Sequence, residues 1–497
     1  MHQALLVPEV LLEILTYVNE ISFTQTTSTQ RSLAALARTC RKFYEPAMDL
    51  LWAEIEELEP LLGCVTRLHP LIYHSDTRWG GPWARGIEPL SAHETRQFLR
   101  HSARIRKLNI DFDHPHFLSL IPAEACVFPR LRSLNISTKY LDLFLPHSLQ
   151  RLYQCHLSTV NQSLQGPFMR RCTDLEHLCI YTPEMGDDDS TANELSLLLS
   201  DRIRWCTRLV TLSCPMLDWA TWKHLSSLPT LLELSIDQGC NDPPSLLKQD
   251  IVDLSPFLSI TTISFRQLYD AAHIIAVMQH SQFPSLKEFR FEANYLGSEE
   301  AEQLFHALSN CKALQTLEKI SIIAYDSKFL DSDGILKPIP HFLRFKQLRT
   351  LELIFCDSCI YLDNDILLEA MSTWPDIHTL EITSSHALPS SVTLHGLFTA
   401  LSLCPQLHTL RVAIDITTID IDPDDDPIQH TSLQKAELEI YEFITDAESL
   451  ARIIFAWLPC VDQVQREDIY WDEVNMHLRS LKAAVGLHVV GASRHYH

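Results

Sequence analysis

A six-residue pattern recurs along most of this chain and constrains its fold more than any other feature. Each copy places apolar residues at its first, fourth and sixth positions, as in Leu348-Arg349-Thr350-Leu351-Glu352-Leu353. The alternation in its second half predicts a short strand with one buried face. The fourth residue of each copy, its anchor, recurs about every 27 residues from Leu108 to Ala436, and this period predicts stacked units with a continuous core.

Helices are expected between these strands. A proline or cysteine often stands directly before a copy, where a preceding helix has to end and the chain has to extend. Ser91 and Glu94 have the spacing of a capping box at the start of one such helix. The predicted helices cover 91–101, 298–309, 364–372, 394–403 and 446–457. The predicted anchors are Leu108, Leu134, Leu152, Leu178, Leu212, Leu234, Ile263, Phe289, Leu317, Leu351, Leu380, Leu410 and Ala436.

One copy resembles the leucine-rich repeat closely. Leu348, Leu351, Leu353, Cys356 and Ile360 reproduce L-x-x-L-x-L-x-x-C-x-x-I. The expected fold class is therefore α/β: a small N-terminal helical module, then an irregular leucine-rich-repeat solenoid with parallel strands on its concave face and helices on its convex face. The expected domains are 1–60 (helical module), 61–100 (connecting segment), 101–465 (solenoid) and 466–497 (C-terminal cap).

The N-terminal segment follows a different pattern. Pro8 suits a helix start, because proline presets φ and needs no hydrogen-bond partner there. Apolar residues then recur at helical spacing over 10–18. A second amphipathic helix is predicted over 32–43, and Pro46 is expected to begin a third that ends at Trp52. Three such short helices cannot bury both of their faces alone, so they need a partner surface.

These residues resemble an F-box, in the manner of F-box proteins from mushroom-forming fungi. The resemblance rests on Pro8-Glu9, on Cys40-Arg41-x-Phe43 and on the closing Leu51-Trp52, and it covers 5–53. In that family the motif docks on the Skp adaptor of a cullin–RING ubiquitin ligase. The resemblance implies adaptor-binding residues at Leu6, Pro8, Ile14, Leu15, Leu33, Leu36, Cys40 and Phe43.

The polar segment 19–31 departs from the family, because it is longer than the usual connection between the first two helices. It is expected to loop out, since the cost of closing a loop grows slowly with length. If it displaces the second helix instead, adaptor binding is in doubt. The same amphipathic spacing also fits an ordinary helical cap on the following domain.

Composition excludes several classes of protein. The formal net charge is −23, with a pI near 5.4, so the chain lacks the basic stripe that nucleic acid requires and does not suit an anionic membrane. No apolar run approaches the roughly 20 residues of a bilayer span, and the N-terminus does not have the pattern of a secretory signal. The fourteen cysteines are then expected to be free thiols in a cytoplasmic or nuclear protein.

Nothing in the sequence points to an enzyme, a cofactor or a metal. The chain has twelve glycines and lacks the glycine-rich motifs that cradle phosphate or present a nucleophile. Cys356-x-x-Cys359 has no second pair to complete a zinc site. His177, His378 and His408 occupy outward strand positions, where neighbouring repeats bring side chains together, although scattered histidines are more often surface residues than ligands.

Three further segments are expected to have no binding or catalytic role. The acidic segments 187–189 and 420–427 lack the alternating ligands and the glycine of a calcium loop, so they are read as solvated insertions. The aromatic segment 79–83 is expected to pack between the N-terminal helices and the repeats.

A docking module joined to an extended receptor implies, with the F-box resemblance, the substrate-recognition subunit of a Skp–cullin–F-box ubiquitin ligase. The helices would hold the Skp adaptor, and through it the cullin, while the repeats hold a target protein. The alternatives are a non-catalytic repeat scaffold without ligase association and an enzyme with a non-obvious site. The residues expected to meet the target on the concave face include Arg132, Asn135, Glu233, Lys287, Arg290, Glu352, Glu381 and Arg411.

Overall fold

The structure is a computed structural model in which the chain forms two compact units, Met1–Thr221 and Trp222–His497. Helix α11 (Trp219–Ser226) contains the point of division. The structure describes residues 7, 10, 13–14, 16–17, 26–73, 88–110, 127–136, 146, 148–156, 173–181, 199–237, 254–268, 271–326, 335–356, 358–384, 390–422, 428–440, 443–464 and 469–492.

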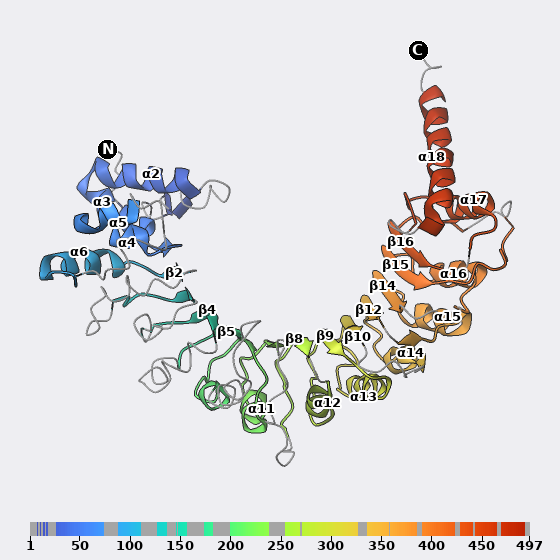
Figure 1. Cartoon of the computed structure of the whole chain (residues 1–497), viewed down its shortest axis with the longest axis horizontal. Helices are drawn as coiled ribbons and strands as arrows, with labels where there is room; N and C mark the ends of the chain where they lie inside the picture. Colours follow the sequence, from blue (N-terminus) through green and yellow to red (C-terminus); the bar gives the residue numbers. More distant parts are fainter. Residues whose placement is uncertain are drawn as a thin grey trace. The chain divides into compact units, whose positions relative to one another are not determined.

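Helices form the beginning of the first unit (Figure 1). Residues 10, 13–14 and 16–17 are helical. Helices α2 (Thr26–Thr39) and α3 (Arg41–Leu51) pack against each other around buried Leu33, Ala37 and Ala47. The helices that follow are α4 (Glu59–Leu62), η2 (Thr66–Leu68), α5 (His69–Tyr73) and α6 (Ala92–Ser102).

The boundaries of α2 and α3 correct two predictions. Residues 26–31, expected in a loop, form the first turns of α2. Pro46, expected to begin a helix, lies inside α3, which begins directly after the extended residue Cys40. Proline removes one hydrogen bond of the helix. Packing of the apolar face of α3 against α2 outweighs this loss, because tertiary contacts supply most of the stability of a short helix.

Parallel strands form the rest of the first unit. Each pairs with the next in sequence order, and the anchors Leu108, Leu134, Leu152, Leu178 and Leu212 lie directly opposite one another. The first strand was not predicted, although its Ile55 lies opposite Leu108. The strands are β1 (Glu54–Ile55), β2 (Lys107–Ile110), β3 (Ser133–Ile136), β4 (Arg151–His156), β5 (His177–Tyr181) and β6 (Thr211–Cys214).

The second unit continues the same architecture with longer strands. Eight described strands pair in parallel in sequence order, and a separate pair, β11 (Ile335–Leu336) and β13 (Cys359–Ile360), forms a small second sheet. The eight strands are β7 (Glu233–Asp237), β8 (Thr262–Leu268), β9 (Glu288–Tyr295), β10 (Lys319–Asp326), β12 (Thr350–Phe355), β14 (Thr379–Ser384), β15 (Thr409–Ala413) and β16 (Lys435–Glu439).

Helices α12–α16 of this unit lie along one side of its strands (Figure 1). The opposite side of the sheet, which these helices do not cover, is called the open face below. The helices predicted from the sequence agree with α13, α15, α16 and α17 to within a few residues. The helices of this unit are α12 (Ala272–Gln279), α13 (Ser298–Ser309), α14 (Pro338–Phe342), α15 (Asn364–Thr373), α16 (Leu394–Leu401), α17 (Ala447–Trp457), η6 (Ile469–Trp471) and α18 (Asp472–Ala492).

The predicted repeat solenoid is confirmed, with one error of register. Leu317 was expected to anchor the strand now seen as β10, but Ile320 lies opposite the anchors Phe289 and Leu351. Leu317 is buried and fills the first position of the pattern, whereas Leu314, taken for that position, is 38% exposed. The copy therefore begins three residues later than predicted, because two overlapping apolar patterns compete in this segment.

A side chain closes the C-terminal edge of the sheet. Val464 forms an isolated bridge to Ala436 of β16. The buried Asn475 of α18 accepts a hydrogen bond from Val464 N at 2.8 Å and donates one to Val464 O at 2.7 Å. These two bonds satisfy backbone groups that an edge strand otherwise leaves open to another chain. Helix α18 thus caps the sheet edge while it packs on α17.

Candidate interaction surfaces

Three of the eight residues predicted to bind the adaptor, Leu6, Pro8 and Leu15, lie outside the described residues. The structure does describe Val10, Ile14 and Tyr17, which are 38%, 41% and 65% exposed. Their spacing of four and three residues places them on one face of a helix. These three side chains are called the N-terminal stripe. The stripe includes Ile14, as predicted, and Tyr17, which the sequence analysis did not select.

The other predicted docking residues belong mainly to the core between α2 and α3. Leu33 is 1% exposed and is a member of that core. Leu36 and Phe43 are partly buried and pack against it, and Cys40 is half-buried just before α3 begins. Leu33 therefore supports the helix pair from inside, and only the outer parts of its neighbours are available for contact.

Basic residues of α6 and the turn after it hold α3 against the first repeats. Arg104 donates to the carboxylates of both Glu45 and Asp49, and its own side chain is 11% exposed. Arg100 donates to the Tyr44 hydroxyl at 3.3 Å. The hydrogen bond from Arg104 is the main reason that the pKa of Glu45 lies below its ordinary value. The sequence pattern does not reveal this contact, and residues 79–83, which were expected to pack this joint, lie outside the described part of the chain.

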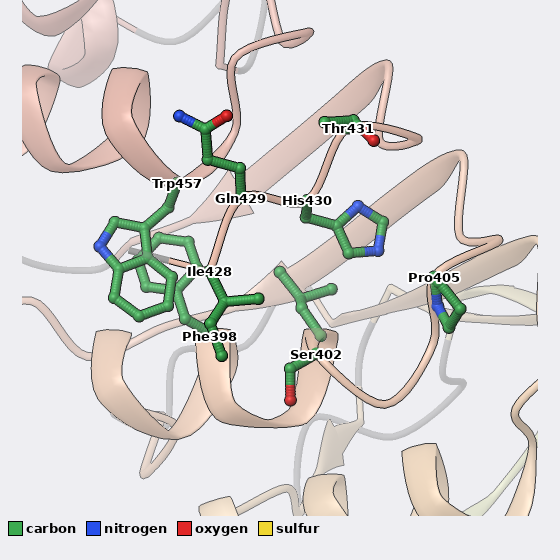
Figure 2. Close-up of a pocket in the computed structure, with 9 residues that line it drawn as sticks. Phe398, Ser402, Pro405, Ile428, Gln429, His430, Thr431 and Trp457 are labelled. Carbon is green, nitrogen blue, oxygen red and sulfur yellow. The ribbon is translucent and has the colours of Figure 1, made fainter. Parts of the chain in front are cut away.

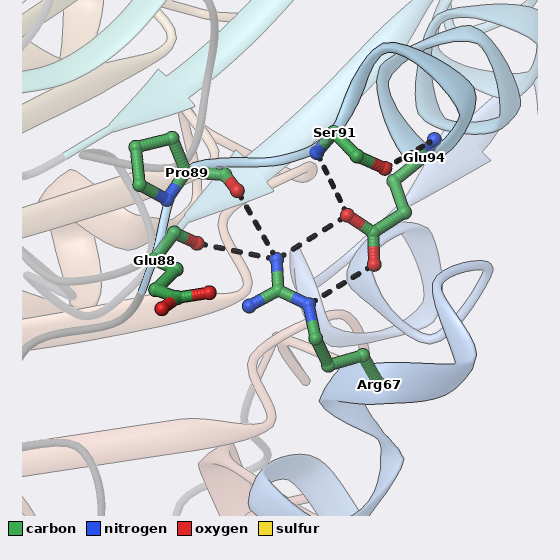
Figure 3. A network of polar contacts seen from close by, with 5 residues as sticks. All are labelled: Arg67, Glu88, Pro89, Ser91 and Glu94. Carbon is green, nitrogen blue, oxygen red and sulfur yellow. Dashed lines mark hydrogen bonds and ion pairs between the residues drawn. The ribbon is translucent and has the colours of Figure 1, made fainter.

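A second arginine fixes the start of α6 (Figure 3). The predicted capping box is present: Glu94 accepts from Ser91 N at 2.8 Å, and Ser91 Oγ accepts from Glu94 N at 3.4 Å. Arg67 adds an ion pair to Glu94, with 3.0 Å between Nε and Oε1, and also donates to the carbonyls of Glu88 and Pro89. Charge-assisted bonding, first of all from Arg67, lowers the pKa of Glu94 to about 2.

The predicted target-binding residues of the first unit are Arg132 and Asn135. Arg132 is exposed, and Asn135 is half-buried on β3. Asn135 lies directly opposite Asn109 of β2, and the Oδ1 atoms of both are buried without a hydrogen-bond donor. The two amides are thus neighbours on the sheet, which the sequence pattern alone did not reveal.

The second unit brings four of its predicted residues into one row on the open face. Arg290, Glu352, Glu381 and Arg411 occupy equivalent positions of β9, β12, β14 and β15, with Ser321 of β10 completing the row. Glu233 and Lys287 are exposed but lie outside this row. These four side chains form one row because residues at the same position of each repeat align across a parallel sheet, and their contact with a target stays a prediction.

Glu381 differs from the other charged residues of the open face in its partners. Arg411 bonds Glu437 at 3.2 Å and Glu439 at 3.1 Å, and Lys319 lies 4.0 Å from Glu352. Glu381 makes no ion pair or hydrogen bond with the side chains that the structure describes. Burial, more than the neighbouring carboxylates, raises its pKa above the ordinary value.

A small pocket lies on the helical side of the second unit (Figure 2). Its volume is about 130 Å³, and it lies between α16, α17 and the segment 428–431. The rings of Phe398 and Trp457 stack in its wall with centroids 4.6 Å apart, and Ile428 beside them is 73% exposed. The buried ring of His430 is satisfied, since Nδ1 accepts from Leu433 N and Nε2 donates to Cys404 O. The pocket is therefore lined by rings and aliphatic carbon together with the polar residues Ser402, Gln429 and Thr431.

The histidine and cysteine candidates do not assemble into a metal centre among the described residues. The ring centroids of His378 and His408 are 5.5 Å apart, and His378 Nε2 lies 3.2 Å from Gln406 Oε1. His177 contacts Thr211 instead, at 2.8 Å. Cys356, predicted in the repeat core, is only half-buried. The ten cysteines described with their side chains are free thiols: Cys40, Cys64, Cys179, Cys206, Cys214, Cys311, Cys356, Cys359, Cys404 and Cys460.

One acidic segment has a structural role that the sequence analysis missed. Asp420 accepts a hydrogen bond from His395 N at 3.1 Å, in the first turn of α16. Thr393, the N-cap of α16, accepts another from Gly396 N. Asp420 therefore helps to cap a helix, where a carboxylate is favourable. Residues 187–189 and 424–426 lie outside the described residues.

The described helices include none with the length and apolar content of a membrane span. No family model matches the chain, and no curated protein matches it.

The solved structures that are similar to this chain include an internalin and a plant receptor ectodomain. An internalin (inlF) from Listeria monocytogenes str. 4b F2365 is 13% identical, with a TM-score of 0.38, and the match covers 74% of this chain and 89% of the internalin. The leucine-rich-repeat ectodomain of the Arabidopsis thaliana receptor kinase GASSHO1/SCHENGEN3, solved with CASPARIAN STRIP INTEGRITY FACTOR 2, is 10% identical, with a TM-score of 0.20. That match covers 69% of this chain and 56% of the ectodomain. At these scores neither likeness bears on how this chain works.

Proposed function

We propose that this chain is the substrate-recognition subunit of a Skp–cullin–F-box type ubiquitin ligase. The N-terminal helices bind the Skp adaptor, and through it the cullin, while the open face of the repeats binds a target protein. The chain itself performs no chemistry in this role. It positions the target for an enzyme that belongs to another subunit.

The observation that carries this proposal is the N-terminal stripe. Val10, Ile14 and Tyr17 expose apolar surface on one helical face, and they do so in the segment that resembles an F-box. Burying such a face against a partner is favourable by about 25 cal/mol for each Å² of apolar area. An exposed stripe beside a packed helix pair therefore suits an adaptor-docking surface better than an internal cap.

The contacts between α3 and α6 support the same role. A recognition subunit has to transmit the position of its docking module to the surface that holds the target. Arg104 ties Glu45 and Asp49 of α3 to the segment that leads into β2. Because Arg104 is largely buried, this link is screened less by salt than a surface ion pair, so the helices and the first repeats move together.

The test is a pull-down of the purified Skp adaptor with the full chain. Ile14→Asp combined with Tyr17→Asp places two charges in the proposed contact, which should abolish binding because a desolvated carboxylate without a partner is costly. Leu368→Asp is the matched control, since Leu368 is similarly exposed at 38% but lies on α15. The control should bind like the parent.

Two results would overturn the proposal. Equal binding by the double variant and the control would mean that the stripe is not the docking face. If the parent chain itself fails to bind the adaptor, the role that remains is that of a repeat scaffold without ligase association.

A further inference from the structure

We propose that the open face of β9, β10, β12 and β14 binds an extended basic segment of the target protein, in which a lysine or arginine stands two residues from an apolar residue. This inference rests on the proposed function, because it concerns the surface assigned there to the target. The surface, called the Ile354 platform, consists of Ile323, Tyr325, Ile354, Glu292, Glu352 and Glu381.

The first argument is the apolar centre of the platform. Ile323 and Ile354 lie directly opposite each other on β10 and β12. Both stand at outward positions, because their sequence neighbours Ile322, Leu353 and Phe355 are the buried ones. They are half-buried although the helices cover the other side of the sheet. Two adjacent isoleucines, flanked on β9 and β14 by Glu292 and Thr383, form a contact surface for an apolar residue.

Tyr325 extends this centre by one outward position along β10. Its side chain is 50% exposed, and its hydroxyl donates to Glu292 Oε1 at 2.9 Å. The hydrogen bond holds the ring beside Glu292, so that a flat apolar face stands next to a carboxylate. Tyrosine is enriched in binding surfaces because it adds contact area at a low cost in conformational entropy.

The second argument is charge. Glu352 and Glu381 lie opposite each other on β12 and β14. The basic side chains around these carboxylates have other partners: Lys435 lies 2.9 Å from Glu437, Arg411 pairs with Glu437 and Glu439, and Lys319 lies 3.7 Å from Glu288 and 4.0 Å from Glu352. A cation from a ligand would give Glu381 the partner it lacks among the described side chains. It would also meet the long-range attraction of a chain with net charge −23.

The third argument is spacing. Ile354 lies opposite Thr383, two residues beyond Glu381 on the same strand. Neighbouring strands lie about 4.8 Å apart and rise about 3.3 Å per residue, so side chains in that diagonal relation are about 8 Å apart. Alternate side chains of an extended peptide are separated by about 6.6 Å. One extended segment therefore places an apolar residue on the isoleucine pair and a basic residue at Glu381 when these two residues are two positions apart, because alternate residues lie on the same side of an extended chain.

The experiment measures binding of two fluorescent peptides to the full chain by anisotropy. One peptide repeats valine, serine, lysine and serine, so that valine and lysine lie two residues apart on the same side of the extended chain, and the other carries glutamate in place of each lysine. The basic peptide should bind and the acidic peptide should not. Glu381→Gln, which keeps the shape of the side chain, should weaken binding of the basic peptide about tenfold. Ile354→Ser should weaken it as well, through lost apolar contact.

Glu369→Gln is the control, because it makes the same change in net charge at an exposed residue of α15. Equal affinity of Glu381→Gln and Glu369→Gln would overturn the inference, since it would reduce the effect to general attraction by an acidic chain. Failure of the parent to bind the basic peptide, or equal binding of both peptides, would also overturn it.

Adaptor binding is measured on the same preparations. The Glu381→Gln and Ile354→Ser variants should bind the adaptor like the parent, which also shows that they are folded. A chain that binds the adaptor but not the basic peptide would refute this inference and leave the proposed function standing. A chain that binds the peptide through Glu381 but does not bind the adaptor would refute the proposed function and leave recognition of the basic peptide standing.

Discussion

Arg67 and Glu94 form a bidentate contact that joins η2 to the first turn of α6. Arg67 Nε lies 3.0 Å from one carboxylate oxygen of Glu94, and Arg67 Nη2 lies 3.3 Å from the other. The second of these oxygens also accepts from Ser91 N at the helix cap. One carboxylate thus serves the helix start and the packing of α6 on the preceding segment at once.

This contact predicts a measurable titration. Arg67→Met should raise the pKa of Glu94 from about 2 toward the ordinary value for glutamate, because it removes the main group that stabilises the ionised form. NMR of a chain with labelled glutamate carboxyl groups would follow the change. Arg106→Met, which changes an exposed arginine directly before β2, should leave the titration of Glu94 unaltered.

The same shift sets the sign of a pH effect on stability. The pKa of Glu94 is lower in the folded chain than its ordinary value of 4.5, so the unfolded chain binds the proton more tightly. The contribution of Glu94 is therefore complete above pH 4.5, declines as the pH falls, and is lost below about pH 2. Denaturant unfolding of the parent and Glu94→Gln should differ at neutral pH and converge in acid. A difference that grows in acid would contradict this assignment.

The buried leucines of β12 and β14 should be sensitive to truncation. Leu351 and Leu380 are fully buried and lie opposite each other, so Leu351→Ala and Leu380→Ala should each lower the free energy of unfolding by about 2–5 kcal/mol. Leu368→Ala, at an exposed position of α15, should cost less than about 1 kcal/mol. Urea unfolding with hydrogen exchange would also show whether the loss is local, as expected in a repeat array.

If both leucine variants shift one sharp unfolding transition by the same amount in every strand, coupling is not limited to neighbouring repeats. Such a result would indicate a more cooperative domain.

Gly396 should not tolerate a side chain. A Cβ at this position would lie 1.9 Å from Asn364 Oδ1, and that oxygen accepts a hydrogen bond from Thr393 N at 3.0 Å. Gly396→Ala would displace the amide and disturb the start of α16, with an expected loss of about 1–3 kcal/mol in unfolding free energy. At Gly297 the nearest atom to a Cβ is 3.6 Å away, so Gly297→Ala should cost clearly less in the same measurement.

The cysteines should differ in reactivity according to burial. Cys460 is exposed, whereas burial raises the pKa of Cys206 and of Cys404 to about 12. Thiolate is the reactive form, so iodoacetamide should modify Cys460 in the folded chain and leave Cys206 and Cys404 intact, as read by peptide mass spectrometry. All fourteen cysteines should react after unfolding without reductant. A residue that stays unreactive then would indicate a disulfide.

The repeat architecture could be predicted from the sequence because each strand is encoded by a pattern of a few neighbouring residues. Alternation of apolar and polar residues specifies the buried side of a strand, and the recurrence of the pattern specifies which residues align. The aligned row of Glu352, Glu381 and Arg411 follows from this alone. Where two apolar patterns overlap, as at Leu314 and Leu317, the local signal is ambiguous, and the register came out three residues wrong.

The N-terminal module shows the limit of such reasoning. Amphipathic spacing marked Leu33 and Ile14 alike as docking residues, yet Leu33 is 1% and Ile14 41% exposed. Periodicity indicates that a helix has an apolar face. It does not indicate whether that face packs against another helix of the same chain or is exposed to a partner.

The sequence by itself determined the inward positions of most strands and the capping box of Ser91 and Glu94, because each depends on residues within a few positions of one another, and the recurrence of the strand pattern determined the repeat period. Only the tertiary structure decided that Arg67 reaches Glu94 across 27 residues, that Arg104 reaches Glu45 and Asp49 across 59 and 55, and that Ile323 and Ile354 lie side by side on the open face. Ion pairs and contact surfaces depend on distances in space, and the packing of the connecting segments sets those distances.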